Sequence, residues 1–106
     1  MHDMLREVAQ VLETAAQVME QRPGLDPDAA VRTAIWGTVP NVDVPDDTAD
    51  GLLYDEAVMA IEGYDAERYG YDPEGIQHLP RRDAIEAARA RAADLFRHCP
   101  PPQRER

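Results

Sequence analysis

Apolar residues recur at steps of three and four along several stretches of this chain, a spacing that predicts amphipathic α-helices. The clearest stretch spans residues 4–19, and its apolar face consists of Leu5, Val8, Leu12, Ala15 and Met19. Asp3 is the expected N-cap of this helix, because its side chain can accept hydrogen bonds from the first free amides. The dipeptide Pro23-Gly24 is expected to end it.

A second helix is predicted by the signals at its two ends. Asp26 can cap the helix, Pro27 suits its first position, and Asp28 lies near the positive end of the helix dipole. Gly37 is the expected stop. The apolar face between these signals consists of Ala30, Val31, Ala34 and Ile35.

Two further helices are predicted later in the chain. The third, over 53–64, presents Leu53, Ala57, Ile61 and Tyr64 and follows a cap at Asp47, Thr48 or Asp50. The last opens near Pro80 and presents Ile85, Ala88, Ala92, Leu95 and Phe96. Residues 38–50 cannot be helical across their two prolines. Residues 63–75, which begin with Gly63, are predicted to be a fraying helix end followed by a loop.

Four helices without a strand pattern predict an all-α fold, either a small bundle or an irregular domain with a long, proline-containing acidic loop. We expect one domain over residues 1–99 and a disordered, Pro- and Arg-containing tail over residues 100–106. The chain of 106 residues has one Phe and one Trp but 16 Ala. Helices lined by alanine can approach closely and leave a thin core, which a homodimer would extend.

Charge is distributed unevenly along the chain. The net charge is −10, all 11 basic residues are Arg, and residues 1–79 carry 17 acids against 4 Arg. Between Thr33 and Glu67 there are nine acids and no basic residue. This asymmetry indicates either a basic partner or general acidity that keeps the protein soluble.

The chain lacks the residues that several functional classes require. The chain has no Ser, which excludes a serine triad, and its single Cys99 excludes an internal disulfide. It has no phosphate-cradling glycine loop, no apolar run long enough to span a membrane and no secretory signal. We therefore expect a cytoplasmic protein without catalytic residues, cofactor or membrane contact.

One segment approaches a calcium-binding loop. With Asp46 at the first position of the loop, Asp50 falls at the fifth and Gly51 at the sixth. The twelfth position requires a bidentate Glu but is Ala57, because Glu56 comes one residue early. The same acids suit the start of a helix, and His98-Cys99 lacks further ligands for zinc. We expect no metal site.

The last helix carries the arginines Arg81, Arg82, Arg89, Arg91 and Arg97. They could contact nucleic acid, but domains that bind DNA directly are usually basic overall, and this chain is acidic. We expect these arginines to pair with acids of the other helices and of their own helix. Direct binding of nucleic acid is therefore not expected.

Tyrosines and acids alternate after residue 63. Such side chains suit an Arg- or Lys-rich partner, although in a chain poor in Phe the tyrosines could equally complete the core. We expect the acids Asp55, Glu56, Asp65 and Glu67 to be solvated. The predicted partner-binding residues are Asp46, Asp47, Asp50, Asp55, Tyr64, Asp65, Glu67, Tyr69 and Tyr71.

These features favour a small acidic module that docks on a basic protein, as inhibitors, immunity proteins, antitoxins and mimics of nucleic-acid charge do. The alternative is an accessory or structural subunit that self-associates through its Ala-rich helices. A small helical enzyme ranks third, because no residue stands out as catalytic. Charges gathered on one face would favour the protein-binding module over the accessory subunit. A deep pocket with converging polar groups would favour an enzyme.

Overall fold

The computed structural model describes residues 2–37, 49–69, 76 and 79–98. This part of the chain forms four helices and no strand: α1 (His2–Gln21), α2 (Pro27–Trp36), α3 (Ala49–Tyr69) and α4 (Arg81–His98). The prediction of an all-α fold with about four helices is confirmed. None of these helices combines the length and the apolar character needed to cross a membrane.

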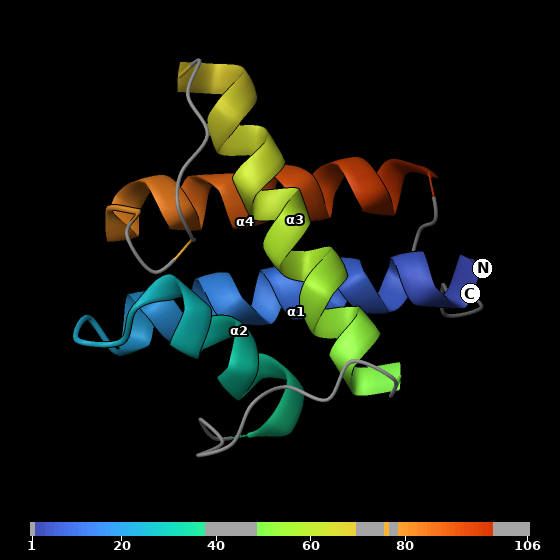
Figure 1. Cartoon of the computed structure of the whole chain (residues 1–106), viewed down its shortest axis with the longest axis horizontal. Helices are drawn as coiled ribbons and strands as arrows, with labels where there is room; N and C mark the ends of the chain where they lie inside the picture. The colour runs from blue at the N-terminus through green and yellow to red at the C-terminus, as the bar shows by residue number, and fades with distance from the viewer. Residues whose placement is uncertain (1, 38–48, 70–75, 77–78, 99–106) are drawn as a thin grey trace, which may run out of the picture.

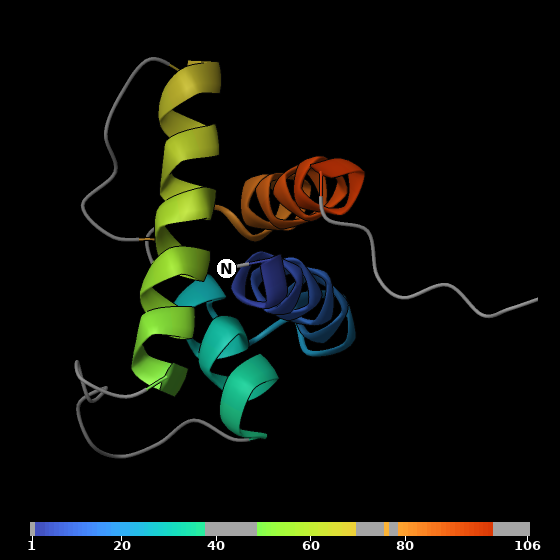
Figure 2. The ribbon, with the colours of Figure 1, turned by 90° about the vertical axis from the view of Figure 1, so that its right-hand side faces the viewer.

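The helices form an irregular bundle. α1 and α4 lie side by side and antiparallel, and α2 lies on the other side of α1 (Figure 1). α3 crosses this layer and packs against all three other helices. Figure 2, turned by 90°, shows α1 and α4 nearly end-on and α3 upright along one side of them. One long face of α3 is therefore left without a neighbouring helix in the described part of the chain.

α2 begins and ends at the residues that its sequence signals predict. The Asp26 Oδ1 accepts a hydrogen bond of 2.8 Å from the Ala29 N–H, with Pro27 at the first helical position. Gly37 adopts a left-handed conformation with φ of 81°, and its N–H donates to the Thr33 carbonyl at 2.7 Å. A residue with a Cβ would be strained at this φ, which explains why a glycine ends the helix.

Two helix starts differ from the prediction. α1 begins at His2, so Asp3 lies in its first turn instead of capping it. α3 begins at Ala49, which places Asp50 in the first turn, where its charge favours the positive end of the helix dipole. The other two proposed caps, Asp47 and Thr48, lie outside the described residues, as do most of the predicted acidic loop, Cys99 and the predicted tail.

α3 is longer than the pattern predicts. The helix continues through Gly63 to Tyr69, so the prediction that it frays from residue 63 is wrong. Contacts with α4 explain the difference, because Tyr64 and Glu67 both bond to side chains of that helix. Such tertiary contacts outweigh the cost of about 1 kcal/mol that a glycine carries inside a helix.

The core is built from small side chains and a few large ones. Leu12, Met19, Val31, Ile61 and Ile76 are the largest apolar residues that are fully buried. Alanines line the buried faces of α1 and α4 and are at most 1% exposed: Ala9, Ala15, Ala16, Ala84, Ala87, Ala88 and Ala92. Alanine therefore supplies much of the buried surface of α1 and α4.

Candidate protein-binding surface

The arginines of α4 make contacts inside the molecule. The Arg89 guanidinium forms two hydrogen bonds to the Glu20 carboxylate of α1, of 2.9 and 2.8 Å. Arg81 Nη1 donates to the carbonyl of Met19, also in α1, at 3.2 Å. The sequence predicts that these arginines pair with acids, and the contact of Arg89 with Glu20 confirms this for Arg89. Arg81 bonds to a backbone carbonyl instead, and Arg82 is exposed.

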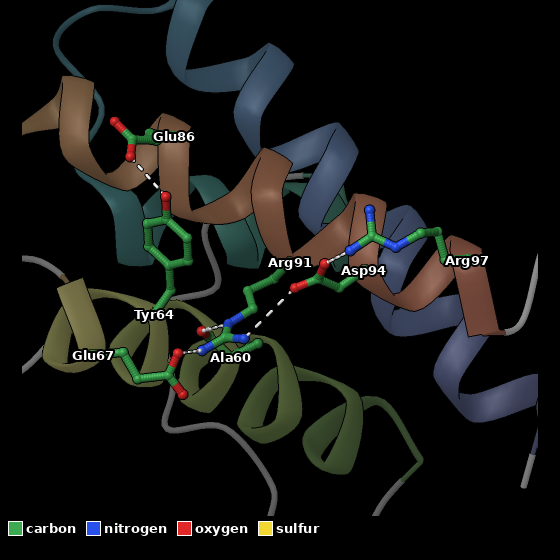
Figure 3. Close-up of polar contacts among 7 residues, drawn as sticks. All are labelled: Ala60, Tyr64, Glu67, Glu86, Arg91, Asp94 and Arg97. Carbon is green, nitrogen blue, oxygen red and sulfur yellow. Dashed lines mark hydrogen bonds and ion pairs between the residues drawn. The ribbon is translucent and has the colours of Figure 1, made fainter.

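Arg91 joins α4 to α3 through several contacts (Figure 3). Its Nε donates to the Ala60 carbonyl at 3.3 Å, and its Nη2 lies 3.2 Å from the Glu67 Oε1. The guanidinium carbon lies 5.5 Å from the centre of the Tyr64 ring, within the range of a cation–π contact. Asp94 of α4 lies 3.7 Å from Arg91 Nη1 and also pairs with Arg97. These contacts hold the second half of α3 against α4.

Tyr64 bonds to α4 as well. Its hydroxyl donates to the Glu86 Oε2 at 2.7 Å, and the same oxygen lies 3.0 Å from Arg68 Nε. The hydrogen bond to Glu86 is the main cause that raises the pKa of Tyr64 above its ordinary value. Two predicted partner-binding residues, Tyr64 and Glu67, are therefore engaged between α3 and α4.

Asp65 is the largest departure from the expected surface. Its side chain is 1% exposed, so the expectation that this acid is solvated is wrong. It follows Ala57 and Ile61 at steps of four and therefore shares their buried face of α3. Its Oδ2 has no hydrogen-bond donor among the described residues. Asp65 does not belong to a surface that a partner could reach.

The remaining predicted residues divide into two groups. Asp50 and Asp55 are exposed on the first half of α3, as is Glu56, and none of the three forms an ion pair with another described residue. Asp46, Asp47 and Tyr71 lie outside the described residues, as does the side chain of Tyr69.

Two exposed apolar residues on the same helix were not predicted from the sequence. Leu52 is 50% exposed and Met59 is 56% exposed, and both lie opposite the buried face that contains Ala57 and Ile61. Their spacing of seven residues, close to two helical turns, could have identified them. A helix with one apolar face would not contain them, because they lie opposite Ala57 and Ile61.

A second polar cluster joins α2 to α3. The Tyr54 hydroxyl donates to Asp28 Oδ1, while Arg32 Nε donates to Asp28 Oδ2 at 2.9 Å. The Arg32 guanidinium also lies 5.0 Å from the centre of the Tyr54 ring, which lies 6.3 Å from that of Trp36. Burial, followed by the hydrogen bond to Asp28, raises the pKa of Tyr54 from 10.0 to about 12.

The raised pKa of Tyr54 predicts a loss of stability at high pH. The folded state holds this proton more tightly than the unfolded state, so its contribution is complete below about pH 10 and is lost as the pH rises towards about 12. In the Tyr54→Phe variant this part of the decline should be absent. Urea unfolding between pH 8 and 12 measures the difference, and parallel declines in the two proteins would contradict the assignment.

A shallow pocket of about 300 Å³ lies where α1, α2 and the start of α3 meet. Glu7 and Asp50 contribute carboxylates to its wall, and Val11, Ile35 and Leu53 contribute apolar surface. Among the described residues, no three of His, Cys, Asp and Glu converge as metal ligands would. Two carboxylates beside apolar side chains could accept a cationic group, but they do not form a nucleophile–base arrangement.

The first half of α3 thus combines exposed apolar side chains with exposed acids that form no ion pair with another described residue. No family model, curated protein or solved structure matches this chain. The function must therefore be inferred from these contacts and charges.

Proposed function

We propose that this chain is a small acidic protein-binding module, without catalytic activity, that docks on a basic surface of a partner protein. Inhibitors, immunity proteins, antitoxins and mimics of nucleic-acid charge are the corresponding classes. The cytoplasm remains the compartment expected from the sequence.

One observation carries the proposal: most of the described arginines contact other groups of the chain, whereas three acids in the first half of α3 form no ion pair with another described residue. Arginines pair with acids of the chain at several positions, namely Arg32, Arg68, Arg89, Arg91 and Arg97. Asp50, Asp55 and Glu56 are exposed and form no such pair with a described residue. Unpaired charges of one sign on one helix attract an oppositely charged protein and speed its association.

The alternative of an accessory subunit that self-associates receives less support. That proposal relies on the Ala-rich helix faces, but the alanines of α1 and α4 named above are buried within a single chain. A homodimer would need a different surface. Direct binding of nucleic acid is disfavoured because exposed acids would face the phosphates.

The test begins with capture of partners from the native host by the tagged chain, followed by purification of the captured protein. We expect a basic protein whose association rate falls steeply between low and physiological salt. The Asp55→Asn/Glu56→Gln variant should associate on the order of tenfold more slowly at low salt, because steering charges have been removed.

The Glu13→Gln/Asp83→Asn variant is the matched control, since it changes the net charge equally on other helices, α1 and α4, and away from the pocket beside Asp50. If the partner is attracted by the charges on α3 and not by the net charge, the association rate of this control should change by less than about twofold. An acidic partner, or association that is insensitive to salt, would refute the proposed function. Equal slowing by both variants would show that net charge alone, and not α3, attracts the partner.

A further inference from the structure

α3 carries apolar residues on two opposite faces. One face contains Ala57 and Ile61, which are fully buried in the core. The other contains Leu52 and Met59, which are seven residues apart and exposed, while Ala66, seven residues further on, is only partly exposed. The outward face of a helix that only covers a core is normally polar. Leu52 and Met59 are two of the three large apolar side chains that stand out as exposed among the described residues.

Acids border this outward apolar face on both sides. At 100° per residue, Asp55 and Glu62 fall on one side of the Leu52–Met59–Ala66 line, and Glu56 and Glu67 on the other. Asp55 and Glu56 are exposed, and the Glu67 side chain remains 75% exposed although it pairs with Arg91. The result is an apolar seam between two acidic borders, with its exposed residues Leu52 and Met59 about 10 Å apart along the helix.

We propose that the outward face of α3 binds an amphipathic α-helix of the partner, with an apolar seam flanked by Arg or Lys. The proposal rests on the proposed function and specifies its surface and its partner. Seven-residue spacing is the repeat by which two helices pack along each other, with flanking charges that select the partner. A helix that presents its apolar residues to Leu52 and Met59 would bring its cations to Asp55 and Glu56.

A second copy of this chain does not fit the same surface. Self-pairing of α3 would place the acidic borders of one copy against those of the other, and like charges at such positions disfavour association. A basic helix relieves this repulsion. Its Arg or Lys stems can also cover the apolar seam while their charged ends reach the carboxylates.

The test uses three synthetic 21-residue peptides as probes. The first places Leu along one helical face with Arg on both sides, the second has the same composition in scrambled order, and the third replaces each Arg with Glu. Each is titrated into the ¹⁵N-labelled full chain, with calorimetry for affinity and amide chemical shifts for location. We expect the patterned Arg peptide to shift the amides of α3 around Leu52 and Met59, and to bind at least about tenfold more tightly than the others.

Truncation variants test the apolar seam directly. Leu52→Ala/Met59→Ala should weaken binding of the patterned peptide on the order of tenfold to a hundredfold, mainly through faster dissociation. Leu5→Ala removes another exposed apolar side chain, 39% exposed on α1, and should leave binding unchanged. Circular dichroism should show that both variants remain folded, since these side chains are not part of the buried core.

Three results would overturn the inference. The scrambled peptide could bind as tightly as the patterned one, or the amide shifts could be confined to the pocket around Glu7. The unsubstituted chain could also form a concentration-dependent dimer that the Leu52→Ala/Met59→Ala variant does not form. The last result would assign the seam to a second copy. None of these would by itself refute the proposed function, which fails only if the captured partner is not basic or its association does not depend on salt.

Discussion

Replacing Ala88 with leucine should lower the free energy of unfolding by about 1–3 kcal/mol. Ala88 is fully buried on α4, among alanines that allow this helix to approach its neighbours. Three additional carbons have no space there, so either the helices separate or the leucine adopts an unfavourable rotamer. Urea denaturation followed by circular dichroism measures the loss.

The control for this prediction is Ala93→Leu, the same substitution at an exposed position of the same helix. Both changes alter helix propensity in the same way, so the difference between them reports the packing alone. A stability of Ala88→Leu equal to that of Ala93→Leu would show that α4 is not closely packed at this point.

The second large effect is expected for Arg91→Ala, which should cost about 2 kcal/mol. Arg91 is the only described residue that contacts Ala60, Tyr64 and Glu67 of α3 together, and its side chain is only 24% exposed. Hydrogen bonds to charged groups contribute more than neutral ones, and removal of the guanidinium leaves the Ala60 carbonyl without this donor. Hydrogen exchange should accelerate in the second half of α3.

Arg97→Ala provides the control for Arg91. Arg97 lies on the same helix, and its described ion pair is with Asp94 of that helix, so its removal should cost less than about 1 kcal/mol. Arg91→Lys should give an intermediate loss, because lysine keeps the charge but lacks the planar fork of donors. Equal losses for Arg91→Ala and Arg97→Ala would contradict the role of Arg91 as the link between α3 and α4.

Local signals in the sequence predicted most of the fold. The ends of α2 followed from Asp26, Pro27 and Gly37 because capping depends only on neighbouring residues. The end of α3 was missed for the opposite reason. Gly63 is a local signal to stop, but Tyr64 and Glu67 reach α4, more than 15 residues further along the chain, and no local pattern shows that contact.

The candidate surface was predicted less completely. Exposed acids at Asp50 and Asp55 agree with the expectation from their residue type. Asp65 disagrees with that expectation. Carboxylates are rarely buried, but Asp65 follows Ile61 by four residues and therefore lies on the buried face of the helix. The spacing of seven residues places Leu52 and Met59 on one side of α3, but the exposure of that side follows from the direction in which α1 and α4 approach α3.

The antiparallel packing of α1 against α4 has a consequence for synthesis of the protein. About 60 residues separate the end of α1 from the start of α4, so the ribosome completes the last helix well after the first. At about 5–20 residues per second, the nascent chain waits roughly 3–12 s before α4 can cover the part of α1 that packs against it. Exposed apolar surface favours aggregation during this interval, and the packing of α1 against α4 must wait until α4 has left the exit tunnel.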